Sequence, residues 1–284
     1  MEKIAVVTDT GSNLSFEQAK ELGIYLLPLQ ITIDETTYQD TLEISTQDIY
    51  KELAKGKMPK TSMATYQKIY DLFEELKKDY DTIFAVPLTN GLSTNASTMQ
   101  SIARELEMKV HVIDMYATCA LEKHVSIWIK KLVDEHKSSE EILKIIQPAI
   151  DKSNSLILVK NLQHLKRGGR LTPMAAALAG LLKIYPILHI NKSTEGRIDV
   201  LNKVRTEKRA DAYAIDKVMD DIDIQHTHIY IIHSDFLEGA NHFKKCFIEK
   251  GVPEQNIHID YISSVIAVHT GLGCIAIQYI REEN

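Results

Sequence analysis

The chain has 284 residues, of which 44% are hydrophobic and 25% are charged, and its formal net charge is −6. This composition is typical of a folded globular protein with a sizeable core, and it excludes a disordered chain. The basic residues form no long run. Nucleic acid is therefore not expected as the main partner, because phosphate binding needs a concentrated positive face.

Targeting and metal-binding signals are weak along the whole sequence. No apolar stretch approaches the roughly 20 residues that cross a bilayer, so we expect no integral membrane segment. Residues Met1–Val7 run directly into a strand pattern and lack the layout of a signal peptide. Cys119, Cys246 and Cys274 are far apart, which argues against disulfides and against a structural zinc site. We expect a cytoplasmic protein without a bound metal.

The first half of the chain alternates strand and helix patterns. Strands are expected at 4–7, 25–33, 82–86 and 110–113, and helices at 15–22, 45–54, 66–76, after 93, 121–132 and 142–150. This alternation predicts a parallel sheet with helices on both faces. Polar loops follow the strands at 8–13, 89–93 and 114. They would meet at the carboxyl edge of the sheet, where open α/β sheets usually bind ligands.

The stretch around Ser93 is the most informative part of this half. An apolar strand pattern ends at Pro87, and a one-sided helical pattern begins after Ser93 or Thr94, either of which can cap the helix. The backbone N–H groups at such a start favour an anion, and a hydroxyl adds a further donor. An ordinary capping turn explains the same residues, so other stretches must decide.

The second half has a different pattern of strands and helices. Strands are expected at 156–159, 184–190, 196–204 and 229–232, helices at 174–182, 210–219 and 237–250, and a β-rich tail at 257–261, 262–270 and 274–280. The segment 59–62 of the first half is expected to be a polar loop. We predict an α/β fold of two domains, an N-terminal Rossmann-like domain over 1–154 and a C-terminal α+β domain over 155–284.

Several short motifs occur in order along essentially the whole chain. They are Val7-Thr8-Asp9-Thr10, Pro59-Lys60-Thr61-Ser62, Leu92-Ser93-Thr94, Leu165-Lys166-Arg167-Gly168-Gly169-Arg170, Tyr185-Pro186-Ile187-Leu188, Val204-Arg205-Thr206 and His269-Thr270-Gly271-Leu272-Gly273. Together they resemble the DegV family, whose characterised members are FakB-type fatty-acid-binding proteins. The resemblance implies two α/β domains with a lipid tunnel between them. The sequence departs from the family pattern at Thr94-Asn95, Met115 and Leu272, where the family usually has Gly-Thr, a hydroxyl residue and proline.

The resemblance also implies a ligand site and a role. The carboxylate of a long-chain fatty acid would be held by hydroxyls of the first domain and a histidine of the second; matched motif by motif, the site residues are Thr61, Ser62, Ser93, His269 and Thr270, with Arg170 close by. The protein would be a carrier, not an enzyme. It would present the acid to a separate ATP-dependent fatty acid kinase for acyl-phosphate formation, in phospholipid synthesis. The kinase would supply nucleotide and metal, so the carrier needs no cofactor and is expected to be a monomer.

Hydroxyls and one imidazole suit a buried carboxylate, which is costly to bury unless it is hydrogen-bonded. Each candidate also has a plain structural explanation. Thr61 and Ser62 can cap the next helix, and His269 can be an ordinary loop histidine. Arg170 can satisfy carbonyl groups at a domain junction. Three basic residues either form a docking surface for the kinase or are the solvated start of a helix: Arg205, Lys208 and Arg209.

Catalysis and dinucleotide binding are the alternatives to the carrier. An enzyme would use Ser93 as nucleophile and His269 as base in acyl or phosphoryl transfer. However, Leu92-Ser93-Thr94 lacks the small flanking residues of a nucleophile elbow, and no acid can be assigned to orient the histidine. Asp9 stands where a Rossmann-like ligand loop would be, but Gly11 alone is no dinucleotide fingerprint.

Overall fold

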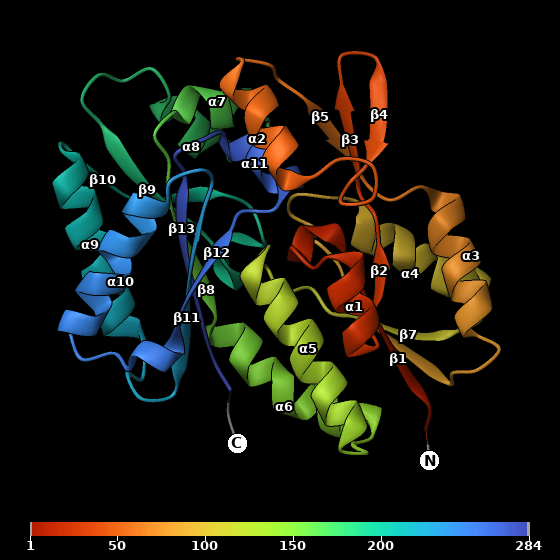
Figure 1. Cartoon of the computed structure of the whole chain (residues 1–284). Coiled ribbons are helices and arrows are strands. Elements are labelled where there is room, and N and C mark those ends of the chain that lie inside the picture. Colours follow the sequence, from red (N-terminus) through yellow and green to blue (C-terminus); the bar gives the residue numbers. More distant parts are fainter. Residues whose placement is uncertain (1, 283–284) are drawn as a thin grey trace.

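The computed structural model describes residues 2–282, and its first half builds a four-stranded parallel sheet with the order β2-β1-β6-β7 (Figure 1). The elements of this sheet and its helices are β1 (Ile4–Asp9), α1 (Phe16–Leu22), β2 (Tyr25–Leu27), α3 (Tyr66–Leu76), β6 (Thr82–Val86), α4 (Asn95–Glu105), β7 (Lys109–Val112), α5 (Ala120–Asp134) and α6 (Ser139–Lys152). One apolar cluster joins the sheet to α3 and α4, and another joins its opposite face to α5 and α6. The parallel sheet covered on both faces is confirmed.

The second half builds a six-stranded mixed sheet with the order β10-β9-β8-β13-β11-β12. Its elements are β8 (Asn154–Leu158), α7 (Leu162–Arg167), α8 (Pro173–Leu178), β9 (Tyr185–Ile190), β10 (Asp199–Val204), α9 (Glu207–Asp221), β11 (Thr227–His233), α10 (Leu237–Glu249), β12 (Ile257–Tyr261), α11 (Ser264–Thr270) and β13 (Ile275–Arg281), with 3-10 turns at Lys192–Thr194 and Glu254–Asn256. A further 3-10 turn, Thr10–Ser12, follows β1 in the first half. Helices α9 and α10 pack on its outer face (Figure 1). A second sheet, separate from the first, is thus confirmed.

A small antiparallel sheet with the order β4-β3-β5 lies beside the junction of the two larger sheets (Figure 1). It consists of β3 (Gln30–Ile33), β4 (Thr36–Gln39) and β5 (Lys60–Ser62), and α2 (Thr46–Ala54) lies between β4 and β5 in the chain. Side chains of this sheet, of α2 and α11 and of the inner face of the six-stranded sheet form one apolar cluster. The Tyr50 hydroxyl on α2 donates to the Ile262 carbonyl oxygen at 2.7 Å. The two halves of the chain therefore share a core.

The structure corrects three sequence-based expectations. Residues 60–62, expected in a loop, form β5 and pair with β3. Residues 264–270, expected in a strand, form α11, because their apolar side chains are buried with helical spacing. The helix expected at 174–182 ends at Leu178, since Ala179 is extended and Gly180 has φ of +100°. Helix α7 was not expected at all.

Two chain-wide features bear on location and covalent structure. Within residues 2–282, no helix combines the length and apolarity that crossing a membrane requires. The three cysteines are free, with Cys119 and Cys274 buried and Cys246 partly exposed.

Candidate ligand-binding site

A cavity of about 440 Å³ lies where the small sheet, the first half and the six-stranded sheet meet. All six residues expected to hold a ligand carboxylate line it: Thr61, Ser62, Ser93, Arg170, His269 and Thr270. They come from β5, the loop before α4, the loop between α7 and α8, and the end of α11. Positions more than 200 residues apart in the sequence are thus brought to one cavity. The three basic residues at the start of α9 are exposed and do not line it: Arg205, Lys208 and Arg209.

The pair Thr61 and His269 joins the two halves of the chain across this cavity. The Thr61 hydroxyl oxygen lies 2.7 Å from His269 Nε2. Burial lowers the pKa of His269 to about 4, and the positive charge of Arg170 lowers it as well, so the imidazole is neutral at pH 7. A hydrogen bond with the Gly168 backbone raises this pKa in part. The tautomer of the neutral ring sets the direction of the bond to Thr61: a proton on Nε2 would leave the threonine hydroxyl free to donate to a ligand, whereas a proton on Nδ1 would make Thr61 the donor to the ring.

The loop that carries Ser93 is held by a buried carboxylate, Asp9, at the end of β1. Asp9 Oδ2 accepts hydrogen bonds from the Leu88 backbone N–H at 2.9 Å and from Asn95 Nδ2 at 2.6 Å. Its Oδ1 accepts from the Gly11 N–H at 2.8 Å. Asp9 therefore fixes both ends of the loop relative to the sheet. The sequence signal was an acid directly after a buried strand, but its partners lie some 80 residues away.

A second buried carboxyl group, Glu122 on α5, lies beside Asp9. A Cβ atom added to Gly11 would lie 2.7 Å from Asp9 Oδ1 and 3.1 Å from Glu122 Oε2, so the position between the two carboxyl groups has room only for glycine. Burial and the neighbouring Asp9 carboxylate raise the pKa of Glu122 well above its usual value. The protonated form of Glu122 is therefore favoured relative to an exposed glutamate, which reduces the repulsion between the two groups. Sequence reasoning did not identify this pair.

Ser93 keeps a free donor at the start of α4. Its Oγ accepts from the Asn95 N–H at 3.2 Å, and its own hydroxyl donates to no residue in the described part of the chain. Thr94 precedes the helix, but its hydroxyl donates to Met63 Sδ at 3.3 Å instead of capping the backbone. A side chain at Gly91 would overlap the backbone of Gly196, so this loop lies directly against the β9–β10 connection. Ser93 is thus held in place with its proton unused.

A smaller apolar cavity of about 20 Å³ adjoins the first and shares four lining residues with it: Leu92, Ile198, Ile266 and Thr270. Its other walls include Ile157 and Ala276 on the inner face of the six-stranded sheet. Among the polar side chains of its lining, Gln278 is paired, because its Nε2 donates to the Thr118 carbonyl and to Ser155 Oγ. The two cavities together offer polar groups at one end and apolar walls at the other.

Catalysis by Ser93 would need a hydrogen bond to a base. His269 Nε2 pairs with Thr61, not Ser93, and no carboxylate accepts from its Nδ1. Over the range 2–282, no group of three or more His, Cys, Asp or Glu side chains is arranged to hold a metal ion. The arrangement favours binding of an anion over chemistry on it.

Met115, where the family pattern usually has a hydroxyl, is fully buried in the cluster that joins α5 and α6 to the first sheet. It does not line the cavity. This departure therefore changes packing behind the site, not the set of donors within it.

The family model described as "Uncharacterised protein, DegV family" matches residues 3–282. A DegV domain-containing protein of Halalkalibacterium halodurans is 30% identical over 289 residues, with 100% of both chains covered. Two crystal structures share the fold over essentially their whole length. A fatty-acid-binding DegV family protein from Streptococcus agalactiae has a TM-score of 0.91 and 29% identity, with 100% of each chain covered. DegV of Bacillus subtilis, described as a fatty-acid-binding protein, has a TM-score of 0.87 and 27% identity, with 99% and 100% covered. The chain therefore belongs to the DegV family.

Proposed function

We propose that this protein binds one long-chain fatty acid, with its carboxylate in the 440 Å³ cavity and its acyl chain along the adjoining apolar walls. The observation that carries the proposal is the convergence of hydroxyls, one neutral imidazole and one guanidinium on a cavity that continues into an apolar one. The two solved relatives named above, both described as fatty-acid-binding, support it. The proposed domains, 1–154 and 155–284, supply the hydroxyls of Thr61, Ser62 and Ser93 and the histidine respectively.

The donors suit a carboxylate that must be both held and released. Burying an unpaired carboxylate is costly, and each hydrogen bond to a charged group contributes about 1.5–3 kcal/mol. Ser93 has a hydroxyl proton to offer. Arg170 already donates to the Gly168 carbonyl at 2.8 Å, so it adds positive charge without being an unoccupied clamp. This balance fits a carrier.

The same geometry supports handover to another protein. Ser62 and Thr94 line the cavity and are exposed, so the carboxylate end lies close to solvent. We infer that the protein has no catalysis of its own and presents the acid, as a cytoplasmic monomer, to a separate fatty acid kinase that serves phospholipid synthesis. Exposed Arg205, Lys208 and Arg209 would form the docking surface.

Native mass spectrometry of protein purified from cells tests fatty acid binding. One fatty acid per chain is expected, and oleate or palmitate should load the stripped protein. Ser93→Ala and His269→Ala should weaken binding while circular dichroism shows a retained fold. Ser97→Ala, on the exposed face of α4, is the matched control. A protein that is always empty and takes up neither acid would overturn the proposal.

A second experiment tests the docking surface. Charge reversal by Arg205→Glu with Lys208→Glu should raise the KM of a purified fatty acid kinase for the loaded protein and leave oleate affinity unchanged. Lys245→Glu, at an exposed position of α10, serves as the control. An unchanged KM would remove these residues from the interface.

A further inference from the structure

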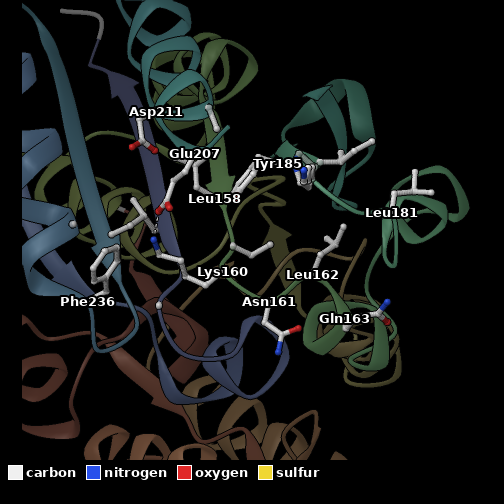
Figure 2. Close-up of a pocket in the computed structure, with 18 of the residues that line it drawn as sticks. Leu158, Lys160, Asn161, Leu162, Gln163, Leu181, Tyr185, Glu207, Asp211 and Phe236 are labelled. Atoms are coloured by element: carbon white, nitrogen blue, oxygen red, sulfur yellow. Dashed lines mark hydrogen bonds and ion pairs between the residues drawn. The ribbon is translucent and has the colours of Figure 1, made fainter. Parts of the chain in front are cut away.

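A second cavity, of about 790 Å³, lies on the opposite face of the six-stranded sheet (Figure 2). Neighbouring residues of the same strands divide between the cavities. On β8, Ile157 lines the small apolar cavity of the candidate site, whereas Leu158 lines the larger one. On β13, Ala276 and Ile275 divide in the same way. Successive side chains of a strand point to opposite faces, so the sheet itself separates the two cavities.

The second cavity occupies a position that often binds ligands. Strands β8 and β11 are both antiparallel to β13, so they point in the same direction and their carboxyl ends lie at one edge. The cavity lies at this edge, between the segments that follow these two strands and the first turns of α9 and α10. Leu158 and Phe243 give it an apolar floor, and Tyr185 and Leu181 lie across from Phe236 (Figure 2). Clefts of this size with apolar walls and a few polar groups are typical small-molecule sites.

The charges around this cavity are unbalanced. Its carboxylates are Glu207, Asp211 and Glu238, and its ammonium groups are Lys160 and Lys183. Lys160 already forms an ion pair with Glu207. Asp211 is half-buried, and within residues 2–282 its carboxylate has neither a hydrogen bond nor an ion pair. Burial and the neighbouring Glu207 raise its pKa, and His242 and Lys160 act in the opposite direction without forming an ion pair with it. A positive charge placed in contact with Asp211 would therefore give this carboxylate the direct partner that it lacks.

The N-termini of the helices at this cavity do not favour binding of an anion. Helices α9 and α10 both begin here, and their positive dipole ends would attract a negative ligand. Glu207 and Glu238 occupy the first turns of these helices and already compensate that charge. The side chain of Lys160 shows that an ammonium group can bind at this cavity. Its ammonium nitrogen lies between the Glu207 carboxylate and the Phe236 ring, 4.7 Å from the ring centroid (Figure 2).

We propose that this cavity is a second ligand site, which takes a small organic amine with an apolar body. The ammonium group binds at Asp211 beside Glu207, and the body packs against Leu158, Phe243 and Tyr185. The site is independent of the fatty acid, because no residue lines both this cavity and the 440 Å³ cavity.

Calorimetric titration of the whole protein with three matched probes tests the charge preference: 4-phenylbutylamine, 4-phenylbutan-1-ol and 4-phenylbutyrate. The amine should bind about tenfold more tightly than the alcohol, and the acid should bind at this cavity more weakly than either. Asp211→Asn should weaken amine binding about tenfold. Asp220→Asn, an exposed position on the same helix, should not change it. Equal affinities for amine and alcohol, or an unaffected Asp211→Asn variant, would overturn the proposal.

Methyl NMR places the probe, because adjacent residues report on opposite faces of the sheet. The amine should shift the Leu158 methyl signals and leave the Ile157 signal in place, in stripped protein and in oleate-loaded protein alike. Shifts at Ile157 without shifts at Leu158 would refute the site. Oleate should show the reverse pattern, so a failure of fatty acid binding and a failure of amine binding remain distinguishable.

Discussion

The two main cavities differ in the charges of the side chains that line them. The 440 Å³ cavity presents hydroxyls, an imidazole whose lowered pKa keeps it neutral at pH 7, and a guanidinium. The 790 Å³ cavity presents three carboxylates and two ammonium groups, and Asp211 and Glu238 have no hydrogen bond or ion pair in the described chain. Strands β8 and β13 line both this cavity and the small apolar cavity that adjoins the 440 Å³ one. The sign of the ligand's charge is therefore decided by a few side chains in loops and first helical turns, and not by the fold.

The cavities also differ in how they are assembled. The first takes residues from 29 to 270, so it exists only when the two halves are joined. The second takes residues from 158 to 275, all from the second half. A ligand in the first cavity should stabilise the junction of the halves, whereas a ligand in the second should stabilise only the six-stranded sheet and its helices.

The largest expected effect concerns the neutral imidazole that distinguishes the first cavity. Folding lowers the pKa of His269 to about 4 from its ordinary 6.5. Above pH 6.5 the histidine is neutral in both the folded and the unfolded chain, so the shift does not affect the free energy of unfolding. As the pH falls from 6.5 toward 4, the unfolded chain binds a proton at this histidine more readily than the folded chain, and the free energy of unfolding decreases. The loss is about 3 kcal/mol. His269→Gln removes this loss and places a neutral amide near Thr61.

Urea unfolding at pH 7.5 and at pH 4.5 measures the difference. The variant should lose less stability on acidification than the natural protein. His226→Gln, at an exposed histidine, should behave like the natural protein. If His269→Gln and the natural protein lose the same free energy, the imidazole is not held neutral by its burial.

The next effect reverses the charge preference of the first cavity. Ser93→Asp places a carboxylate against the proposed fatty acid headgroup, and like charges at short range repel. Oleate affinity should fall about 100-fold. The amine affinity of the second cavity should not change. Ser97→Asp, one helical turn further and exposed, is the control in the same fluorescence-displacement assay. Unchanged oleate binding in Ser93→Asp would place the headgroup elsewhere.

Much of this architecture could be predicted from local sequence. The apolar run of β1 and the one-sided pattern of α3 indicate the elements directly, because β1 is buried along its whole length whereas α3 buries one face with a period of 3.6 residues. The motifs around Thr61, Ser93 and His269 indicated which polar residues to consider. The structure brings all three to one cavity.

The remainder depended on tertiary contacts that no local pattern contains. Helix α11 resembles a strand in sequence because it is rich in β-branched residues, and its packing against α2 decides otherwise. The Asp9–Glu122 pair joins positions 113 residues apart, and only the folded chain shows that burial and the Asp9 carboxylate raise the pKa of Glu122. The carboxylates of the second cavity, Glu207, Asp211 and Glu238, belong to none of the motifs, since the cavity forms from strand ends and helix starts that are individually ordinary.

A smaller effect tests whether the sheet separates the cavities. Ile157→Phe adds volume to the narrow apolar cavity of about 20 Å³, where overpacking costs about 1–3 kcal/mol. Affinity for palmitate should fall about tenfold, with octanoate less affected because its shorter chain stops before this point. Leu158→Phe, at the next residue, should leave both acids unchanged and weaken the amine. Equal effects of the two substitutions on palmitate would mean that the acyl chain does not run along the inner face.

The smallest effect separates two hydroxyls that the sequence presents as equivalent. Ser62 is exposed and its Oγ donates to Gln30 Oε1 at 3.0 Å, whereas Ser93 is half-buried with an unused proton. A hydrogen bond to a carboxylate gains less where water competes and an existing bond must be exchanged. Ser62→Ala should therefore weaken oleate binding only about threefold, and Ser93→Ala should weaken it more. Isothermal titration of both variants decides the order. A larger loss in Ser62→Ala would mean that the carboxylate lies nearer the rim of the cavity than the loop before α4.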